Sequence, residues 1–214
     1  MIITIDGPAG TGKSTVAKRV AEALGFVYFD TGAMYRGVTY LMLENTISIE
    51  DTKGIEEILK NFTFEITKDK RYFVNKVDVS KEIRSQEVNG FVSQVAALPF
   101  VRKSLGPIQK EFGKHANAVF EGRDLGTVIF PDAEVKIFLT ARPEIRATRR
   151  LKETKYEITY EKLLADIIQR DHMDTTREVS PLRCPEGALQ IDTSDLTIDQ
   201  VVEKILNYKH SKYP

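Results

Sequence analysis

The stretch MIITIDGPAGTGKST (residues 1–15) decides the fold of this chain. It opens with β-branched residues at positions 2–5, a composition that is typical of a short buried strand. Over residues 14–24 the apolar side chains recur at helical spacing, and Gly25 follows as a C-terminal stop. The stretch therefore predicts a strand, a glycine-rich loop and a helix in direct succession.

The glycine-rich loop fits the pattern G-x-x-x-x-G-K-[ST], and it lies between a strand and a helix, as that pattern requires. Glycines allow backbone amides to surround an anion, and the N-terminus of the helix adds a partial positive charge. In this pattern Lys13 reaches the β- and γ-phosphates, and the hydroxyl of Ser14 supplies an oxygen to Mg²⁺. The alternative is a tight turn whose glycines serve the backbone alone. The residues that we expect to bind ATP are Gly7, Pro8, Ala9, Gly10, Thr11, Gly12, Lys13, Ser14 and Thr15.

Further short apolar segments have the composition of buried strands, and helical patterns separate them, including one over residues 33–43. This alternation predicts a mostly parallel sheet with helices on both faces. The expected fold class is therefore α/β, with a five-stranded parallel sheet of the P-loop NTPase type. The segments expected to join the first strand in this sheet are residues 26–29, 118–120, 135–139 and 188–191.

The pattern changes between about residues 44 and 85. FTFEI (62–66) and YFVNKVDVS (72–80) alternate apolar with polar residues, and the charged turn KDKR (68–71) joins them. Such alternation predicts a small antiparallel hairpin module inserted into the α/β core. We therefore expect a core at 1–43, an insert at 44–85 and the remaining core at 86–214.

The composition narrows the class of partner. Lysine plus arginine and aspartate plus glutamate number 31 each in 214 residues, so no net field attracts nucleic acid or a membrane surface. The sequence shows neither a secretory signal pattern nor a long apolar run, and it has one cysteine, Cys184, which agrees with a reducing compartment. We expect a cytoplasmic protein that binds no nucleic acid and no membrane. The balanced charge and the lack of a coiled-coil heptad favour a monomer.

A phosphate loop does not by itself name the reaction. The base-reading N-K-x-D of GTPases is absent, and the chain is short for a motor or transporter ATPase. Guanidinium groups suit phosphate oxygens, so many arginines beside a phosphate loop indicate two phosphorylated substrates. For any one arginine, a solvated helix face is the alternative. The arginines that can return to the loop are Arg36, Arg102, Arg123, Arg142, Arg146, Arg149, Arg150, Arg170 and Arg177.

Four further motifs follow the phosphate loop in order: DTGAMYR (30–36), VSQVAALPFVR (92–102), EGRDLGTVIFPDA (121–133) and RDHMDTTREVSPL (170–182). Together with GPAGTGKST they resemble the bacterial cytidylate kinases, and the resemblance spans nearly the whole chain. It implies transfer of the γ-phosphoryl group of ATP to CMP or dCMP, with Mg²⁺ bridging the phosphates.

The resemblance also implies roles for single residues. Arg36, Arg123 and Arg177 correspond to the arginines that hold the monophosphate and, with Lys13, count as catalytic. Ser93, Arg102 and Asp124 correspond to the residues that read the base, because a carboxylate accepts from the N4 amino group of cytosine. Asp174 and Arg170 correspond to the contacts with the pentose. The full set expected to bind CMP is Thr31, Arg36, Ser93, Arg102, Arg123, Asp124, Arg170, Asp174 and Arg177.

The basic segment from Arg142 to about Tyr160 is expected to act as a lid over the ATP phosphates. Arg146 and Arg150 are its expected ATP contacts, and an exposed basic helix is the alternative. Three positions depart from the family pattern: Thr31 stands where serine is common, Glu121 where aspartate is frequent, and Met173 where a charged residue is common. Two other functions stay open at this point: a P-loop kinase for another monophosphate such as UMP, and a non-catalytic nucleotide sensor.

Overall fold

The computed structural model describes residues 1–67, 69, 71–114, 116–153 and 157–213. By its internal contacts the chain divides into two units. The first consists of Met1–Asp30 together with Lys110–Pro214, and the second consists of Thr31–Gln109. The expected insert, residues 44–85, lies within the second unit.

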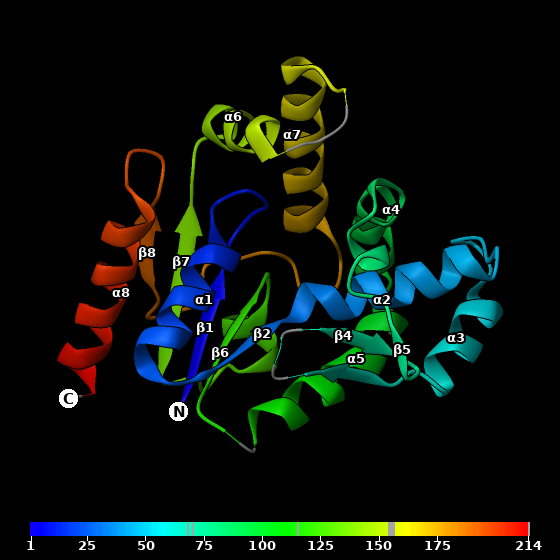
Figure 1. Ribbon diagram of the computed structural model, residues 1–214, viewed down its shortest axis with the longest axis horizontal. Helices are drawn as coiled ribbons and strands as arrows, with labels where there is room; N and C mark the ends of the chain where they lie inside the picture. Colours follow the sequence, from blue (N-terminus) through cyan, green and yellow to red (C-terminus); the bar gives the residue numbers. More distant parts are fainter. Residues whose placement is uncertain (68, 70, 115, 154–156, 214) are drawn as a thin grey trace. The chain divides into compact units, whose positions relative to one another are not determined.

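The first unit contains a five-stranded parallel sheet, which confirms the predicted fold class. The strand order is β2-β6-β1-β7-β8, so the strand that precedes the phosphate loop lies at the centre (Figure 1). Central strands of parallel sheets are buried on both faces, and all but the first residue of β1 are buried, including the polar Thr4 and Asp6. The strands are β1 (Ile2–Asp6), β2 (Val27–Asp30), β6 (Ala118–Gly122), β7 (Val135–Thr140) and β8 (Leu189–Asp192).

Each face of this sheet has its own apolar cluster. Alternate residues of a strand point to opposite faces, so Ile3 and Ile5 pack with residues of α1 (Lys13–Leu24) and α8 (Ile198–Lys212) on one face. Figure 1 shows these two helices beside the strands. On the other face, Phe120 packs with residues of the short helical turn η2 (Leu125–Ile129). The sheet therefore fixes both the phosphate loop and the turn that follows β6.

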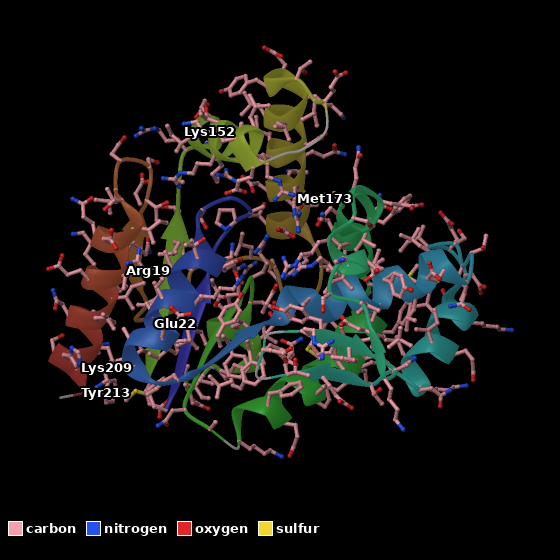
Figure 2. The ribbon with its side chains drawn as sticks, in the orientation of Figure 1. Arg19, Glu22, Lys152, Met173, Lys209 and Tyr213 are labelled. Carbon is pink, nitrogen blue, oxygen red and sulfur yellow. The ribbon has the colours of Figure 1, made fainter. Side chains whose placement is uncertain are left out.

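Helix ends in this unit follow ordinary capping chemistry. Gly25 ends α1 in the left-handed conformation, with φ of 67°. Thr197 and Gln200 form a reciprocal capping box at the start of α8. Arg19, labelled in Figure 2, forms an ion pair with Asp199 and so joins α1 to α8. The other helices of the unit are α6 (Pro143–Glu153) and α7 (Tyr160–Thr176), which pack against each other.

The second unit combines helices with a small antiparallel sheet of order β3-β4-β5. We expected one hairpin from this segment, but YFVNKVDVS folds back on itself and forms two of the three strands. The reason is local: Asn75 and Lys76 both have positive φ, 48° and 68°, as a tight hairpin turn requires. The elements are α2 (Thr31–Glu44), α3 (Thr52–Lys60), β3 (Phe64–Ile66), β4 (Tyr72–Val74), β5 (Val77–Asp78), η1 (Glu82–Arg84), α4 (Gln86–Ala97) and most of α5 (Pro99–Gly113).

The predicted strands and helices occur where the sequence places them, with ends that move by one or two residues. For example, β2 runs from Val27 to Asp30, one residue later than expected, and α2 begins at Thr31. Strand and helix ends depend on capping and on register with neighbours, so pattern alone leaves them uncertain by a residue or two. Among the helices that the structure describes, none is long and apolar enough to cross a membrane.

Candidate functional site

The phosphate loop connects β1 to α1, as the sequence predicts. Gly7 is required by close approach, since a Cβ there would lie 2.1 Å from the carbonyl oxygen of Leu139. The buried Lys13 donates from Nζ to the carbonyl of Pro8 at 2.7 Å, and Thr11 donates to the same carbonyl at 3.1 Å. Burial and the charge of Arg123 lower the pKa of Lys13 well below its usual value. Its position at the loop is set by the hydrogen bond to Pro8, and a bound anion would stabilise the charged form of Lys13.

Ser14, the expected metal ligand, is held by a carboxylate. Its Oγ donates a hydrogen bond of 2.9 Å to Oε2 of Glu121, and the hydroxyl of Tyr28 donates to Oε1 of the same group. Glu121 is at the carboxyl end of β6, in register with Asp30 at the end of β2. Burial and the charge of Asp30 raise the pKa of Glu121 above its usual value. Nearby positive charge would therefore stabilise the ionised form of Glu121.

This donor set fits the chemistry of Mg²⁺, which prefers oxygen ligands and binds through one or two protein groups plus phosphates. The hydroxyl of Ser14 and the carboxylates of Glu121 and Asp30 are all oxygen donors. Glu121 was not expected to be a site residue. The signal that could have identified it is an acidic residue at the carboxyl end of an apolar strand, because those strand ends converge at the phosphate loop.

Arginine and aspartate side chains gather where β6 and α7 end. Arg123 donates from Nε to Oδ2 of Asp174 at 2.9 Å. Arg177 lies between two carboxylates: Nη2 is 3.5 Å from Oδ1 of Asp124, and Nη1 is 3.8 Å from Oδ1 of Asp174. The structure thus brings together four of the residues that the sequence predicts for CMP. We call Arg123, Asp124, Asp174 and Arg177 the arginine–aspartate cluster.

Electrostatics in this cluster keep Asp174 ionised. Burial by itself raises the pKa of Asp174, but the charges of Arg123, Arg170 and Arg177 and the hydrogen bond from Arg123 outweigh it, so the pKa is lowered. Arg177 is further held by its Nε, which donates to the carbonyl of Ser180 at 2.6 Å. The guanidinium groups are therefore positioned by protein partners, as pre-organised binding of a dianion requires.

Four of the residues expected at the CMP site lie in the second unit. Thr31 is the first residue of α2 and is buried, and Arg36 follows on the same helix. Ser93 is half-buried on α4. Arg102 on α5 is buried; its Nη1 donates to the carbonyl of Ala96 at 2.8 Å, and its guanidinium lies 5.2 Å from the ring centre of Tyr35.

The segment expected as a lid forms α6, and part of it, residues 154–156, lies outside the described residues. Arg146 on α6 is 2% exposed. Its guanidinium donates to the carbonyls of Ala141 and Ala9 at 2.9 and 3.1 Å and to both carboxylate oxygens of Asp171 at 3.0 and 2.5 Å. Arg146 therefore ties the phosphate loop to α7 through its own bonds. Arg150, the other expected ATP contact, is half-buried on the same helix.

The phosphate loop and the arginine–aspartate cluster both belong to the first unit. A family model described as cytidylate kinase matches residues 3–211. A cytidylate kinase of Protochlamydia amoebophila is 54% identical, covering 98% of this chain and 96% of the relative. One from Carboxydothermus hydrogenoformans is 49% identical, covering 96% of both chains.

Solved structures share the fold at much lower identity. The shikimate kinase from Bacteroides thetaiotaomicron matches with a TM-score of 0.52 and 13% identity, covering 98% of each chain. At this identity the likeness concerns the fold alone. The full-length match to the family model and the identity to its curated members show that this chain belongs to the cytidylate kinase family, a family of phosphotransferases.

Proposed function

We propose that this enzyme transfers the γ-phosphoryl group of ATP to CMP or dCMP, giving ADP and CDP or dCDP. The observation that carries the proposal is the arginine–aspartate cluster, because an enzyme that joins two phosphate groups needs a second cationic site besides its phosphate loop. The geometry of Arg123 and Arg177 supports this role: both are held by buried carboxylates at the carboxyl end of the sheet unit.

In the reaction an oxygen of the CMP phosphate forms a bond to the γ-phosphorus of ATP while the bond from that phosphorus to the β,γ-bridging oxygen breaks. The attacking oxygen is already ionised, so no general base is required. Positioning and neutralisation of charge then account for most of the catalysis. Lys13 and the loop amides would hold the transferring group, and Arg36, Arg123 and Arg177 would hold the acceptor phosphate.

Ser14 is the proposed protein ligand of Mg²⁺, and Glu121 orients it by accepting its hydroxyl proton in a hydrogen bond. Bound Mg²⁺ would neutralise charge on the β- and γ-phosphates. Tyr28 in turn fixes the second oxygen of Glu121. The chain's own contribution is therefore a hydroxyl whose direction is set before the nucleotide binds.

Asp124 is proposed to read the base. Its carboxylate would accept from the N4 amino group of cytosine, with Ser93 and Arg102 donating to ring acceptors. Uracil presents an acceptor at the same place, so a buried carboxylate would face an oxygen without a donor, which hydrogen-bonding sites reject strongly. Asp174 and Arg170 are proposed to contact the pentose, and Thr31 to lie at the phosphate.

Arg146 and Arg150 on the basic segment at residues 142–160 are proposed to contact ATP when that segment closes.

The protein is proposed to be a cytoplasmic monomer that binds nucleotides but no nucleic acid and no membrane. Equal numbers of basic and acidic residues support this, and light scattering on a sizing column tests the oligomeric state.

The test of the proposed reaction is coupled ADP release with Mg·ATP and, separately, CMP, dCMP, UMP and AMP. We expect rapid turnover of CMP and dCMP and slow turnover of UMP and AMP. Asp124→Ala should lose activity with the cytosine substrates and not with UMP, because only cytosine has a donor for the lost carboxylate. Preference for UMP would indicate another monophosphate kinase, and ATP binding without turnover of any monophosphate would indicate a nucleotide sensor.

A further inference from the structure

Asp6, the last residue of β1, directly precedes the phosphate loop, and its carboxylate binds the turn that follows β6. It is fully buried, and each oxygen accepts one backbone N–H: Oδ1 from Leu125 at 3.0 Å and Oδ2 from Gly126 at 2.8 Å. These are the first two amides of the turn Leu125–Ile129. Amides at the start of a helical turn have no carbonyl of a preceding turn to accept their hydrogen bonds. Asp6 therefore caps a turn that lies about 120 residues further along the chain.

The residue at the N-cap position of this turn is Asp124. Aspartate at an N-cap ordinarily uses its own carboxylate to accept amide protons of the first turn. Here the side chain of Asp124 makes no such bond, and Oδ1 instead lies 3.5 Å from Nη2 of Arg177. Asp6 therefore caps the turn, and the carboxylate of Asp124 lies near Arg177 instead.

The close approach of the turn to β1 is built into the packing. A Cβ on Gly126 would lie 2.7 Å from Cγ of Pro185 and 3.0 Å from Oγ1 of Thr4, so a larger residue would move the amide away from Asp6. Leu125 is buried beside Phe120 on the same face. The glycine and the apolar contact bring the two amides close to β1, where the carboxylate of Asp6 accepts them.

We propose that Asp6 is a positioning residue for base recognition: it caps the turn in place of Asp124 and thereby keeps the carboxylate of Asp124 directed at the cytosine amino group. This role rests on the proposed function. Asp6 would also link the two nucleotide sites. It directly precedes the phosphate loop, and it sets the direction of Asp124, which is proposed to read the base of the acceptor.

The test measures the ratio of kcat/KM for CMP to that for UMP. Asp6→Asn replaces one acceptor by an NH₂ group that faces an N–H, so the turn relaxes and Asp124 can cap it. We expect the ratio to fall about tenfold, the usual range for one unsatisfied buried polar group. The Kd for Mg·ATP, measured by titration calorimetry, should stay within about twofold, since the loop backbone is unchanged; a general structural defect would weaken both.

Thr4→Val is the matched control. Thr4 lies on the same strand and face, touches the same turn, and within the part of the chain that the structure describes its hydroxyl has no hydrogen-bond partner. Removing that hydroxyl should leave the ratio unchanged. The pair Asp6→Asn with Asp124→Ala tests the route: if Asp6 acts through Asp124, adding Asp6→Asn to Asp124→Ala should change the ratio no further.

Two measurements decide the matter if Asp6→Asn does not fold. Gly126→Ala moves the same amides without changing the carboxylate, and it should lower the ratio as well. In the wild type the ratio should fall on acidification below about pH 6, because burial raises the pKa of Asp6 to about 6 and a protonated carboxyl cannot accept both amides. The titratable groups facing Asp6 are Asp124, Lys13 and Cys184; its register partners on β6 and β7 are Gly122 and Phe138, which do not titrate.

An unchanged ratio in Asp6→Asn, beside a wild type that prefers CMP, would overturn the positioning role and leave the proposed function intact. An equal loss for both pyrimidines, or a further loss in the double variant, would overturn it too. A wild type that does not phosphorylate CMP would overturn the proposed function and this role together.

Discussion

The guanidinium of Arg123 donates a 2.9 Å hydrogen bond from Nε to Oδ2 of Asp174, which joins the end of β6 to the last turn of α7. Asp174 is almost fully buried, and Arg177 approaches its other oxygen. A single carboxylate thus orients two arginines that we propose hold the acceptor phosphate. Its charge has consequences for stability as well as for binding.

Asp174→Asn should lower the free energy of unfolding at pH 7 by about 2 kcal/mol, because it leaves arginine charges without their partner. The pKa of Asp174 is lowered in the folded protein, so its contribution is present at neutral pH and is lost as the pH falls through that lowered value. Urea titrations of both proteins at several pH values measure this. The difference should shrink toward acid pH.

Asp199→Asn is the control for that experiment. Asp199 also pairs with an arginine, Arg19, but its side chain is 75% exposed. Exposed pairs contribute little, so this variant should stay within about 0.5 kcal/mol of the wild type at every pH. Equal effects of the two substitutions would contradict the role given to burial.

Lys13→Met should reduce kcat about a hundredfold or more, because we propose that Lys13 holds the transferring phosphate. The KM for CMP should change little, since we propose that the arginines hold the acceptor. Steady-state kinetics with both substrates varied measure the two effects separately. Lys204→Met, an exposed lysine on α8, is the matched control and should retain full activity.

Glu121→Gln should raise the Mg²⁺ concentration needed for half-maximal activity about tenfold, as loss of a residue that orients a metal ligand commonly does. Glutamine can still accept from Ser14 through its amide oxygen, while its NH₂ group then faces the hydroxyl of Tyr28, so the change removes the charge and one acceptor. Binding of Mn²⁺ to the enzyme–ADP complex, followed by electron paramagnetic resonance, gives a readout apart from turnover. Glu203→Gln on α8 is the control, and unchanged Mn²⁺ affinity in Glu121→Gln would remove Glu121 from the metal site.

Asp6 should make the wild type less stable as the pH rises. Burial raises the pKa of Asp6 to about 6, so the folded protein holds this proton more tightly than the unfolded chain. The free energy of unfolding should therefore fall between about pH 4 and pH 7, by about 3 kcal/mol from this group. Asp6→Asn lacks the effect, so its stability relative to the wild type should improve with pH even though base selection worsens. A constant difference across this range would refute the linkage.

The sequence by itself determined the α/β class, the phosphate loop and the family. These follow from patterns that are local or that recur in order along the chain: a β-branched run before a glycine loop, helical spacing after it, and four further motifs. The antiparallel module was predicted too, but as one hairpin. The second turn, at Asn75 and Lys76, depends on positive φ at two residues that have no glycine to signal it.

Only the tertiary structure decided which charged groups pair. Glu121 holds Ser14 across 107 positions, and Asp6 caps a turn 119 and 120 positions away, because parallel strands place the carboxyl ends of distant segments side by side. The bonds from the guanidinium of Arg146 to Ala9 and Asp171 likewise join segments far apart in the sequence. Hydrogen bonds need angstrom-scale placement that packing provides, and residue spacing along the chain contains no such information.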